Sequence, residues 1–242
     1  MITPMGTAQK KTVAVIGLGY VGLPLAVRAV ERGYDVIGFD THAEKVEVLK
    51  KKKSPIEDQY LIDNIPKFPF EATTDASRLA DADIVLICVP TPVDEMYYPD
   101  LEPVISAATV SAEHLKKGAL VVLESTVNPG VSEEVIRPIF EEHGHKLGKD
   151  VFIAHCPERI NPGDEKWNVT NIPRVVGAFD QKGLKMALEF YRAIVDGEIR
   201  PMKSIREAEA VKVVENSFRD INIAFVNELA RSFDVLGIDV KD

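Results

Sequence analysis

The chain has 242 residues, of which 45% are hydrophobic and 28% charged, and its formal net charge is −9. This composition is typical of a globular protein with one large domain or one domain and an appendage, and the acidic balance disfavours nucleic acid and anionic membranes as partners. The two cysteines form no metal-binding pattern, and no apolar run approaches the ~18 residues of a membrane span. We therefore expect no metal, no nucleic acid, no membrane and a cytoplasmic location.

Short apolar strands alternate with helical patterns along most of the chain. The strand patterns are rich in Val and Ile and almost continuously hydrophobic, which is typical of parallel strands covered on both faces. The strands are TVAVIG, YDVIGFD, DIVLICVP, GALVVLEST, DVFIAH and PRVVGAF, and the helices between them cover Leu23–Glu31, Ala43–Lys52, Glu102–His114, Ser132–His143 and Lys182–Ile194. The alternation predicts an α/β fold with a doubly wound, mostly parallel sheet of the Rossmann type.

The pattern changes after residue 202. From Ile205 to Leu236 there is no proline and no strand pattern, and apolar residues recur at helical spacing. They are Ala208, Val211, Val214, Phe218, Ile221, Phe225, Leu229 and Phe233. One helix of about 30 residues would be about 45 Å long, longer than one layer of the sheet requires. We therefore divide the chain into an α/β domain, residues 1–202, and the start of a helical domain, residues 203–242, whose long helix connects to another domain or a partner subunit.

A glycine-rich turn follows the first strand. Gly17, Gly19 and Gly22 in VAVIGLGYVGLPLA form the pattern G-x-G-x-x-G between a strand and a helix. The first glycine permits a tight turn, the second lets the backbone approach a pyrophosphate, and the third permits close packing of helix and strand. Asp40 ends the second strand, where a carboxylate accepts hydrogen bonds from the adenosine ribose and repels the extra phosphate of NADP. Because no basic neighbour would hold that phosphate, we predict NAD; the alternative is a purely structural turn.

Four further stretches carry a family resemblance. In chain order they are VPTPVDEMYYPDL, ESTVNPG, PERINPGDEKWNVTNIPRVVGA and EAVKVVENSFRDINIAFVNELA. Together with the glycine motif they resemble the UDP-glucose/GDP-mannose dehydrogenase family over essentially the whole chain, Thr12 to Asp239. The PERINPG form resembles the bacterial and archaeal branch that oxidises UDP-N-acetylhexosamines. The resemblance implies oxidation of the C6 alcohol of such a nucleotide sugar to a carboxylate, with two NAD and a cysteine thioester, usually to supply polysaccharide precursors.

The resemblance also assigns roles to residues of this chain. Thr126 would hydrogen-bond the catalytic water, Glu158 would be the base for thioester hydrolysis, and Lys212 and Asn216, four apart on one helix face, would stabilise an oxyanion. Without the resemblance, Lys212 and Asn216 would be interpreted as solvated helix positions, and Glu158 as a capping or salt-bridged loop carboxylate. The residues expected at the cofactor are Gly17, Gly19, Tyr20, Val21, Gly22, Asp40, Val89, Pro90, Thr91 and Thr126.

The position of the nucleophile decides what the chain itself is expected to do. The family's catalytic cysteine lies in a Gly-Gly-x-Cys stretch beyond the long helix, and no such stretch occurs here. Cys156, two residues before Glu158, is interpreted as a packed structural thiol, and Cys88, inside an apolar strand, as a core thiol. We therefore expect an N-terminal portion or truncation without the UDP-binding domain, which binds NAD without turnover. The long helix implies a homodimer.

Two other functions compete with this interpretation. A two-electron β-hydroxyacid dehydrogenase also combines a Rossmann domain with a long helix that carries Lys and Asn four apart, but it lacks a stretch of the PERINPG type. A non-catalytic NAD-binding or dimerisation module is the third class. The sequence does not identify the sugar.

Overall fold

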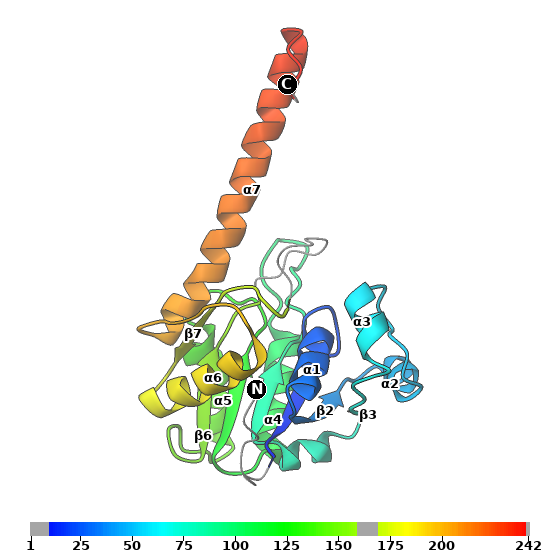
Figure 1. The fold of residues 1–242 in the computed structure, drawn as a ribbon. Helices are drawn as coiled ribbons and strands as arrows, with labels where there is room; N and C mark the ends of the chain where they lie inside the picture. Colours follow the sequence, from blue (N-terminus) through cyan, green and yellow to red (C-terminus); the bar gives the residue numbers. More distant parts are fainter. Residues whose placement is uncertain (1–9, 159–168, 241–242) are drawn as a thin grey trace.

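The computed structural model describes residues 10–158 and 169–240. Within these residues, eight strands form one sheet in the order β3-β2-β1-β4-β5-β6-β7-β8. Figure 1 shows the sheet at the centre of the molecule, with helices on both sides. The strands are β1 (Thr12–Ile16), β2 (Asp35–Phe39), β3 (Glu71–Thr73), β4 (Ile84–Ile87), β5 (Ala119–Leu123), β6 (Val151–His155), β7 (Arg174–Ala178) and β8 (Ile199–Pro201).

The strand order reverses beside β1. This strand pairs in parallel with β2 on one side and with β4 on the other, so the chain winds outward from the centre in both directions. A crevice therefore opens at the carboxyl ends of β1 and β4, which is where ligands bind in sheets of this kind. Strands β4, β5 and β6 continue in parallel, whereas β7 runs antiparallel to β6.

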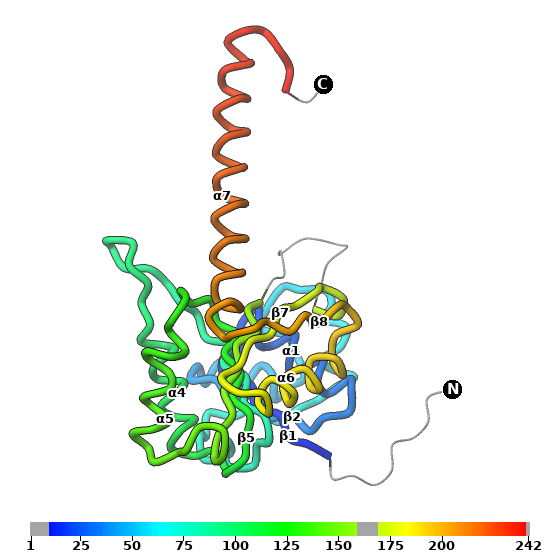
Figure 2. Tube along the Cα trace, turned by 90° about the vertical axis from the view of Figure 1, so that its left-hand side faces the viewer, coloured from blue at the N-terminus to red at the C-terminus, as the bar shows by residue number. Residues whose placement is uncertain are grey.

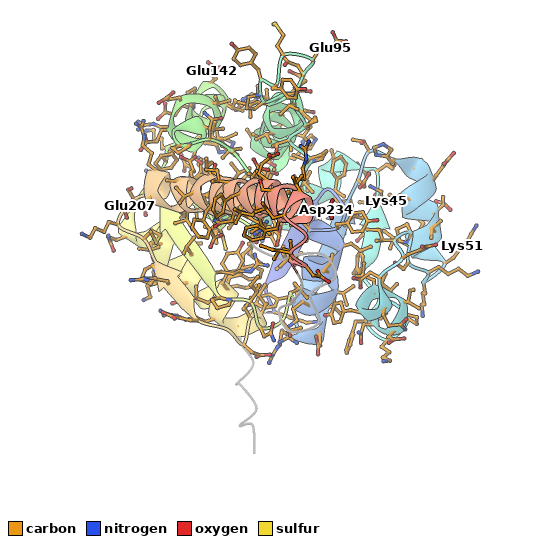
Figure 3. The ribbon with its side chains drawn as sticks, turned by 90° about the horizontal axis from the view of Figure 1, so that it is seen from above. Lys45, Lys51, Glu95, Glu142, Glu207 and Asp234 are labelled. Carbon is orange, nitrogen blue, oxygen red and sulfur yellow. The ribbon has the colours of Figure 1, made fainter. Side chains whose placement is uncertain are left out.

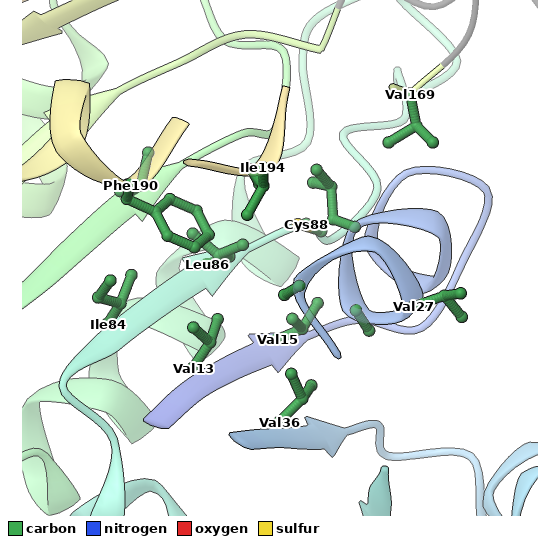
Figure 4. Close-up of a cluster of buried hydrophobic side chains, with 14 of the residues drawn as sticks. Val13, Val15, Val27, Val36, Ile84, Leu86, Cys88, Val169, Phe190 and Ile194 are labelled. Carbon is green, nitrogen blue, oxygen red and sulfur yellow. The ribbon is translucent and has the colours of Figure 1, made fainter. Parts of the chain in front are cut away.

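Helices cover both faces of the sheet and create two hydrophobic clusters. Val13 and Val15 of β1 face one cluster, and Ala14 and Ile16 face the other, as the two-residue period of a strand requires. Figure 4 shows the first cluster, in which Phe190 lies beside Leu86, and Val13 and Val15 lie on the same side of the sheet. The first cluster contains residues of α1 (Gly22–Glu31), α2 (Ala43–Lys50), α3 (Gln59–Asn64) and α6 (Gln181–Ile194); the second contains residues of η1 (Ala76–Asp81), α4 (Glu102–His114), η2 (Ser132–Ile136) and α5 (Arg137–Glu142).

Helix α7 (Ile205–Val235) leaves the domain. It begins at Ser204, whose side chain accepts a hydrogen bond from the Glu207 N–H, a normal N-cap. Its buried residues, Ile205, Ala208, Glu209 and Lys212, all lie near its start. The rest of the helix projects away from the sheet (Figures 1 and 2), and in a view from above it leans over the domain from Glu207 towards Asp234 (Figure 3).

The exposed part of α7 is strongly apolar. Phe218 is 70% exposed, Ile221 67% and Phe225 61%, and Val214, Ile223 and Val226 are exposed as well. Aromatic and branched side chains of this size are normally covered in a folded assembly. This part of the helix therefore presents an unpartnered apolar face.

The predicted fold class is confirmed: the sheet is of the Rossmann type, mostly parallel, and a long helix follows it. Four elements were not predicted, namely α3, β3, η1 and β8. The strands β3 and β8 are only three residues long, and β8 ends in Pro201, which places it at the sheet edge because proline lacks a ladder donor. The predicted helix Ser132–His143 begins with a π-helical segment, since Pro138 cannot donate the normal backbone bond.

The described residues include only part of one sequence motif. The PERINPG motif covers residues 157–163, and residues 159–163 of it belong to the range 159–168 that lies outside the described residues. Among the helices of the described part, none is both long enough and apolar enough to cross a lipid bilayer.

Candidate active and cofactor site

A cavity of about 640 Å³ opens at the carboxyl ends of β1, β2 and β4. Its lining includes seven of the ten residues predicted to contact the cofactor: Gly17, Gly19, Tyr20, Val21, Asp40, Val89 and Pro90. Gly22, Thr91 and Thr126 are not part of its lining. The lining residues that were not predicted are Ile16, Phe39, Thr41, His42, Lys45, Cys88, Pro103, Ser106, Ala107 and Val110. The cavity lies at the switch point of the sheet, where a dinucleotide is expected.

The three glycines of the loop have different steric surroundings. Gly17 has φ +91°, and a Cβ there would lie 2.8 Å from the Cys88 carbonyl oxygen. A Cβ at Gly22 would lie 2.0 Å from the carbonyl oxygen of Gly17, so only glycine allows α1 to start so close to the loop. No atom lies within 4 Å of a Cβ built at Gly19, which leaves open space for a ligand. Helix α1 lacks a side-chain cap at Val21, although its Leu23 N–H already donates to the Gly19 carbonyl and Pro24 has no N–H, so what it offers a phosphate is mainly the positive end of its dipole.

Asp40 is buried and its carboxylate has four donors. Oδ2 accepts the Leu18 N–H at 2.8 Å and lies 2.6 Å from Lys45 Nζ, while Oδ1 accepts the His42 N–H at 2.9 Å and lies 3.0 Å from His42 Nδ1. Burial raises the pKa of Asp40, but the Lys45 ammonium and the two N–H groups outweigh it, so its pKa lies below the ordinary value. Asp40 therefore stays ionised, and it also holds the glycine loop through Leu18.

The expectation that Asp40 has no basic neighbour is wrong. Lys45 comes from the first turns of α2, five residues after Asp40, and helical geometry returns its side chain to the end of β2. Sequence reasoning examined only the residues directly after Asp40. Lys45 neutralises part of the carboxylate charge, so the repulsion of a 2′-phosphate is weaker than Asp40 alone would produce.

A second group of polar side chains lies where α7 crosses the ends of β5 and β6. Glu158 Oε2 lies 3.6 Å from Lys212 Nζ, with side chains only 14% and 9% exposed. Burial raises the pKa of Glu158, although the ammonium of Lys212 opposes the rise. Its other oxygen, Oε1, is buried and has no hydrogen-bond partner within residues 10–158 and 169–240. A carboxylate with a raised pKa and a free oxygen is suited to accept a proton.

The other two predicted catalytic residues are placed differently. Thr126 is partly buried in the segment that follows β5, and the Glu158 N–H donates to the carbonyl of Glu124 in that segment at 3.4 Å. Asn216 lies one turn beyond Lys212 on α7 and is exposed. The structure thus pairs Glu158 with Lys212 and brings the segment of Thr126 beside them, while Asn216 faces solvent.

A buried ionic network lies beneath Glu158. Arg174 Nη1 donates to both carboxylate oxygens of Glu124, at 3.0 and 2.8 Å, and both side chains are 0% exposed. The Tyr191 hydroxyl also donates to Glu124, and Cys156 Sγ lies 3.9 Å from Arg174 Nη1. No sequence pattern indicates this network, because its members come from the ends of β5 and β6, from β7 and from α6.

Both cysteines are buried, as predicted. Burial and the nearby Glu124 carboxylate raise the pKa of Cys156 to about 12, and burial raises the pKa of Cys88 as well. A thiol with a raised pKa and no solvent access is a poor nucleophile. Cys156 is thus a packed member of the network around Arg174.

Glu209 anchors α7 to the segment after Thr126. This carboxylate is 0% exposed and accepts the N–H groups of Gly130 at 2.7 Å and Ser132 at 2.8 Å, at the start of η2. Negative charge is favoured there by the unpaired N–H groups of the helix start. Glu209 precedes Lys212 by three residues on the same helix face. This anchor was not predicted from the sequence, because the partners of Glu209 lie 77 to 79 residues away along the chain.

Family models match two parts of the chain. Residues 11–195 match the model described as "UDP-glucose/GDP-mannose dehydrogenase family, NAD binding domain". Residues 206–242 match the central domain of the same family. The first match alone covers more than half of the chain.

Curated relatives of this chain are named as nucleotide-sugar dehydrogenases. A "UDP-N-acetyl-D-glucosamine 6-dehydrogenase" of Pseudomonas aeruginosa is 39% identical over 232 residues, which are 95% of this chain and 54% of that protein. A "UDP-N-acetyl-D-mannosamine dehydrogenase" of Methanococcus maripaludis is 37% identical over 98% of this chain and 55% of its own length. The chain thus spans about half the length of the curated relatives it matches.

Solved structures agree with the fold. The UDP-D-ManNAc dehydrogenase of Pyrococcus horikoshii superposes with a TM-score of 0.89 at 33% identity, covering 94% of this chain and 55% of that one. A 3-hydroxyisobutyrate dehydrogenase of Mycobacterium tuberculosis reaches a TM-score of 0.68 at 20% identity, which indicates a shared fold only.

Proposed function

Because the chain belongs to the UDP-glucose/GDP-mannose dehydrogenase family, we propose that it forms the NAD-binding part of a nucleotide-sugar 6-dehydrogenase. The proposed substrate is a UDP-N-acetylhexosamine, whose C6 alcohol is oxidised to a carboxylate. The names of relatives that match nearly the whole chain support this substrate class. The observation that carries the proposal is the buried Glu158–Lys212 pair at the same edge of the sheet as the NAD cavity.

The cavity has the features that NAD requires. When bound, NAD accepts one hydride in each of the two oxidation steps. The open space at Gly19 and the start of α1 fit the pyrophosphate. We expect the ionised Asp40 carboxylate to accept hydrogen bonds from the adenosine ribose in place of its present side-chain donors, Lys45 and His42. Residues 11–195 are the NAD-binding domain of the family, so the cofactor assignment and the cavity agree.

Four polar groups provide acid–base and electrostatic chemistry. We assign Glu158 as the base that takes a proton from the hydrolytic water, at the free oxygen Oε1. Lys212 supplies the positive charge that stabilises a developing alkoxide or oxyanion, and Thr126 orients the water. Asn216 is assigned as an amide donor to the same oxyanion. Because Asn216 is exposed, its hydrogen-bond acceptor would be the oxyanion of the bound substrate.

The covalent step needs a thiol other than those of this chain. Cys88 and Cys156 are buried and their pKa values are raised, so neither can capture an aldehyde. We therefore expect the 242-residue chain to bind NAD but not to produce NADH continuously from a UDP-sugar.

We also propose that two copies pair through α7 in the cytoplasm. The exposed Phe218, Ile221 and Phe225 form an apolar face on a helix that matches the start of the family's central domain. Covering that face with the same helix of a second copy would bury these side chains. The two unpaired thiols support a reducing compartment.

Calorimetry together with absorbance tests the proposal. The chain is titrated with NAD and NADP, and it is then incubated with NAD and each of the UDP-N-acetyl derivatives of glucosamine, mannosamine and galactosamine. We expect NAD binding and no sustained absorbance of NADH. Absence of NAD binding would contradict the cofactor site, and sustained NADH production that Cys156→Ala abolishes would restore Cys156 as nucleophile.

A further inference from the structure

Arg174 is a buried cation that the proposed chemistry does not use. Its side chain is 0% exposed, and only Nη1 has a protein partner; Nε and Nη2 have none in the described part of the chain. A buried guanidinium with unused donors is unfavourable for stability, and an apolar residue of similar volume would serve the core better. Such an arrangement at the edge of an active site suggests a role in the site.

The network reaches Glu158 through the backbone as well as through charge. The carbonyl of Glu124 accepts the Glu158 N–H, while the carboxylate of Glu124 accepts bonds from Arg174 and Tyr191. Arg174 also contacts the Cys156 thiol, two residues before Glu158. Residues 156–158 are therefore held against the end of β5 by one connected set of contacts.

Resting on the function proposed above, we propose that Arg174, held by Glu124 and Tyr191, is a positioning residue for Glu158. Its guanidinium fixes the segment from Cys156 to Glu158 against the end of β5 and places a permanent positive charge beneath the Glu158 carboxylate. Arg174 does not touch the substrate or the cofactor. It acts by keeping the base in place and in the ionised form that accepts a proton.

The charges around Glu158 determine the direction of the expected effect. Within the described residues they are Lys212 of α7, Arg174 of β7, Glu124 after β5, Cys88 after β4 and Cys156 after β6, with Tyr191 of α6 bonded to Glu124. Burial raises the pKa of Glu158, and the Glu124 carboxylate raises it as well. The positive charges of Lys212 and Arg174 lower this pKa, and the effect of Arg174 is larger than that of Glu124. Removing Arg174 and Glu124 together must therefore raise the pKa further.

The test measures the Glu158 carboxyl directly in the 242-residue chain. Its side-chain carbon is titrated by NMR, with the resonance assigned by its loss in Glu158→Gln. The main variant is Glu124→Leu with Arg174→Met, which removes both charges and keeps the volume, so that no lone charge stays buried. We expect NAD affinity within twofold of the parent chain and an upward shift in the pKa of Glu158. Arg174→Lys, which retains the charge, should restore most of the original value.

A second variant and a control keep the test decisive. Tyr191→Phe fits the same space and removes one donor from Glu124, so the Glu124 charge is less compensated and we expect a smaller rise in the pKa of Glu158. The control Lys10→Met with Asp35→Leu removes an exposed ion pair at the amino end of β2 and should leave Glu158 unchanged.

The outcomes separate this proposal from the proposed function. Folded variants that bind NAD normally and show an unchanged Glu158 titration would reduce Arg174 to a structural role. If the double variant does not fold, an unchanged titration in Tyr191→Phe leads to the same conclusion. Loss of NAD binding in the parent chain would contradict the proposed function instead.

Discussion

Lys45 Nζ lies 2.6 Å from Asp40 Oδ2, at the rim of the cofactor cavity. The pair joins the start of α2 to the end of β2, and the same carboxylate oxygen also accepts the Leu18 N–H of the glycine loop. Asp40 thus fixes the loop, and it is also the residue proposed to bind the adenosine ribose. Lys45 adjusts how strongly Asp40 repels an additional phosphate.

Asp40→Ala should weaken NAD binding. The variant loses the proposed ribose hydrogen bonds and the anchor of Leu18, so we expect a loss of about 1–3 kcal/mol, the range for hydrogen bonds to a charged acceptor. Calorimetry with NAD measures the loss. Asp35→Ala, at the exposed start of the same strand, is the matched control and should bind as the parent chain does. If Asp40→Ala binds NAD as tightly as the parent chain does, Asp40 does not belong to the cofactor site.

Lys45→Met should increase the preference for NAD over NADP. Without the ammonium, the full charge of Asp40 faces the 2′-phosphate, and we expect the ratio of NADP to NAD affinity to fall about fivefold, or about 1 kcal/mol. Competitive titration with both cofactors measures the ratio. Lys50→Met, at the end of α2 and paired with Glu47, should not change it. An increased relative affinity for NADP would contradict the placement of Lys45.

His155 should make the fold sensitive to mild acid. It is fully buried, and burial lowers its pKa to about 3 from the ordinary 6.5. Between these values the unfolded chain binds the proton and the folded chain does not, so stability is complete above pH 6.5 and is lost as pH falls. From pH 7.5 to 5.5 the His155 contribution should fall by about 1.4 kcal/mol.

Urea unfolding at the two pH values measures this loss. His155→Leu should remove that part of the pH dependence, and the exposed His143→Gln should retain it. Glu124 and Glu158, whose pKa values are raised, contribute with the opposite sign in all three proteins and cancel in the comparison. A pH dependence unchanged by His155→Leu would show that this histidine is not buried in its neutral form.

Glu209→Ala should destabilise the domain. Two buried N–H groups, those of Gly130 and Ser132, would lose a charged acceptor, so we expect a loss of about 3 kcal/mol in the free energy of unfolding. Glu228→Ala is a suitable control on the same helix, because Glu228 is exposed and pairs only with Arg231. Faster hydrogen exchange at Gly130 and Ser132 should accompany the loss. A change below 1 kcal/mol would mean that water replaces the carboxylate without difficulty.

Phe218→Ser combined with Phe225→Ser should abolish pairing through α7. Both side chains are exposed and apolar, and removing them leaves little surface for a second copy to cover. Light scattering over a range of concentrations should show a dimer for the parent chain and a monomer for the variant, with unchanged NAD affinity. Arg219→Ser, between the two positions, is the control. A parent chain that stays monomeric at every concentration is the outcome incompatible with the proposed dimer.

The sequence determined the features that depend on local patterns. Alternating apolar strands and helices predicted the Rossmann-type sheet, since each element carries its own periodicity, and the run from Ile205 predicted one long helix. The glycine positions predicted a cofactor loop because the constraint is local: Gly17 needs φ +91° and Gly22 nearly touches the loop backbone. Residues 126, 158, 212 and 216 were proposed from a resemblance, and their catalytic roles stay predictions.

Only the tertiary structure decided which charges meet. Lys45 reaches Asp40 because the first turn of α2 lies beside the end of β2, Arg174 meets Glu124 because β7 runs antiparallel to β6, and Glu209 meets Gly130 because the start of α7 lies beside the start of η2. None of these contacts leaves a periodic signal, since a buried charge needs one partner at one distance, and that partner can lie anywhere along the chain. Folding brings these segments together, and burial then makes their charges strong enough to hold the cofactor loop and the proposed base in place.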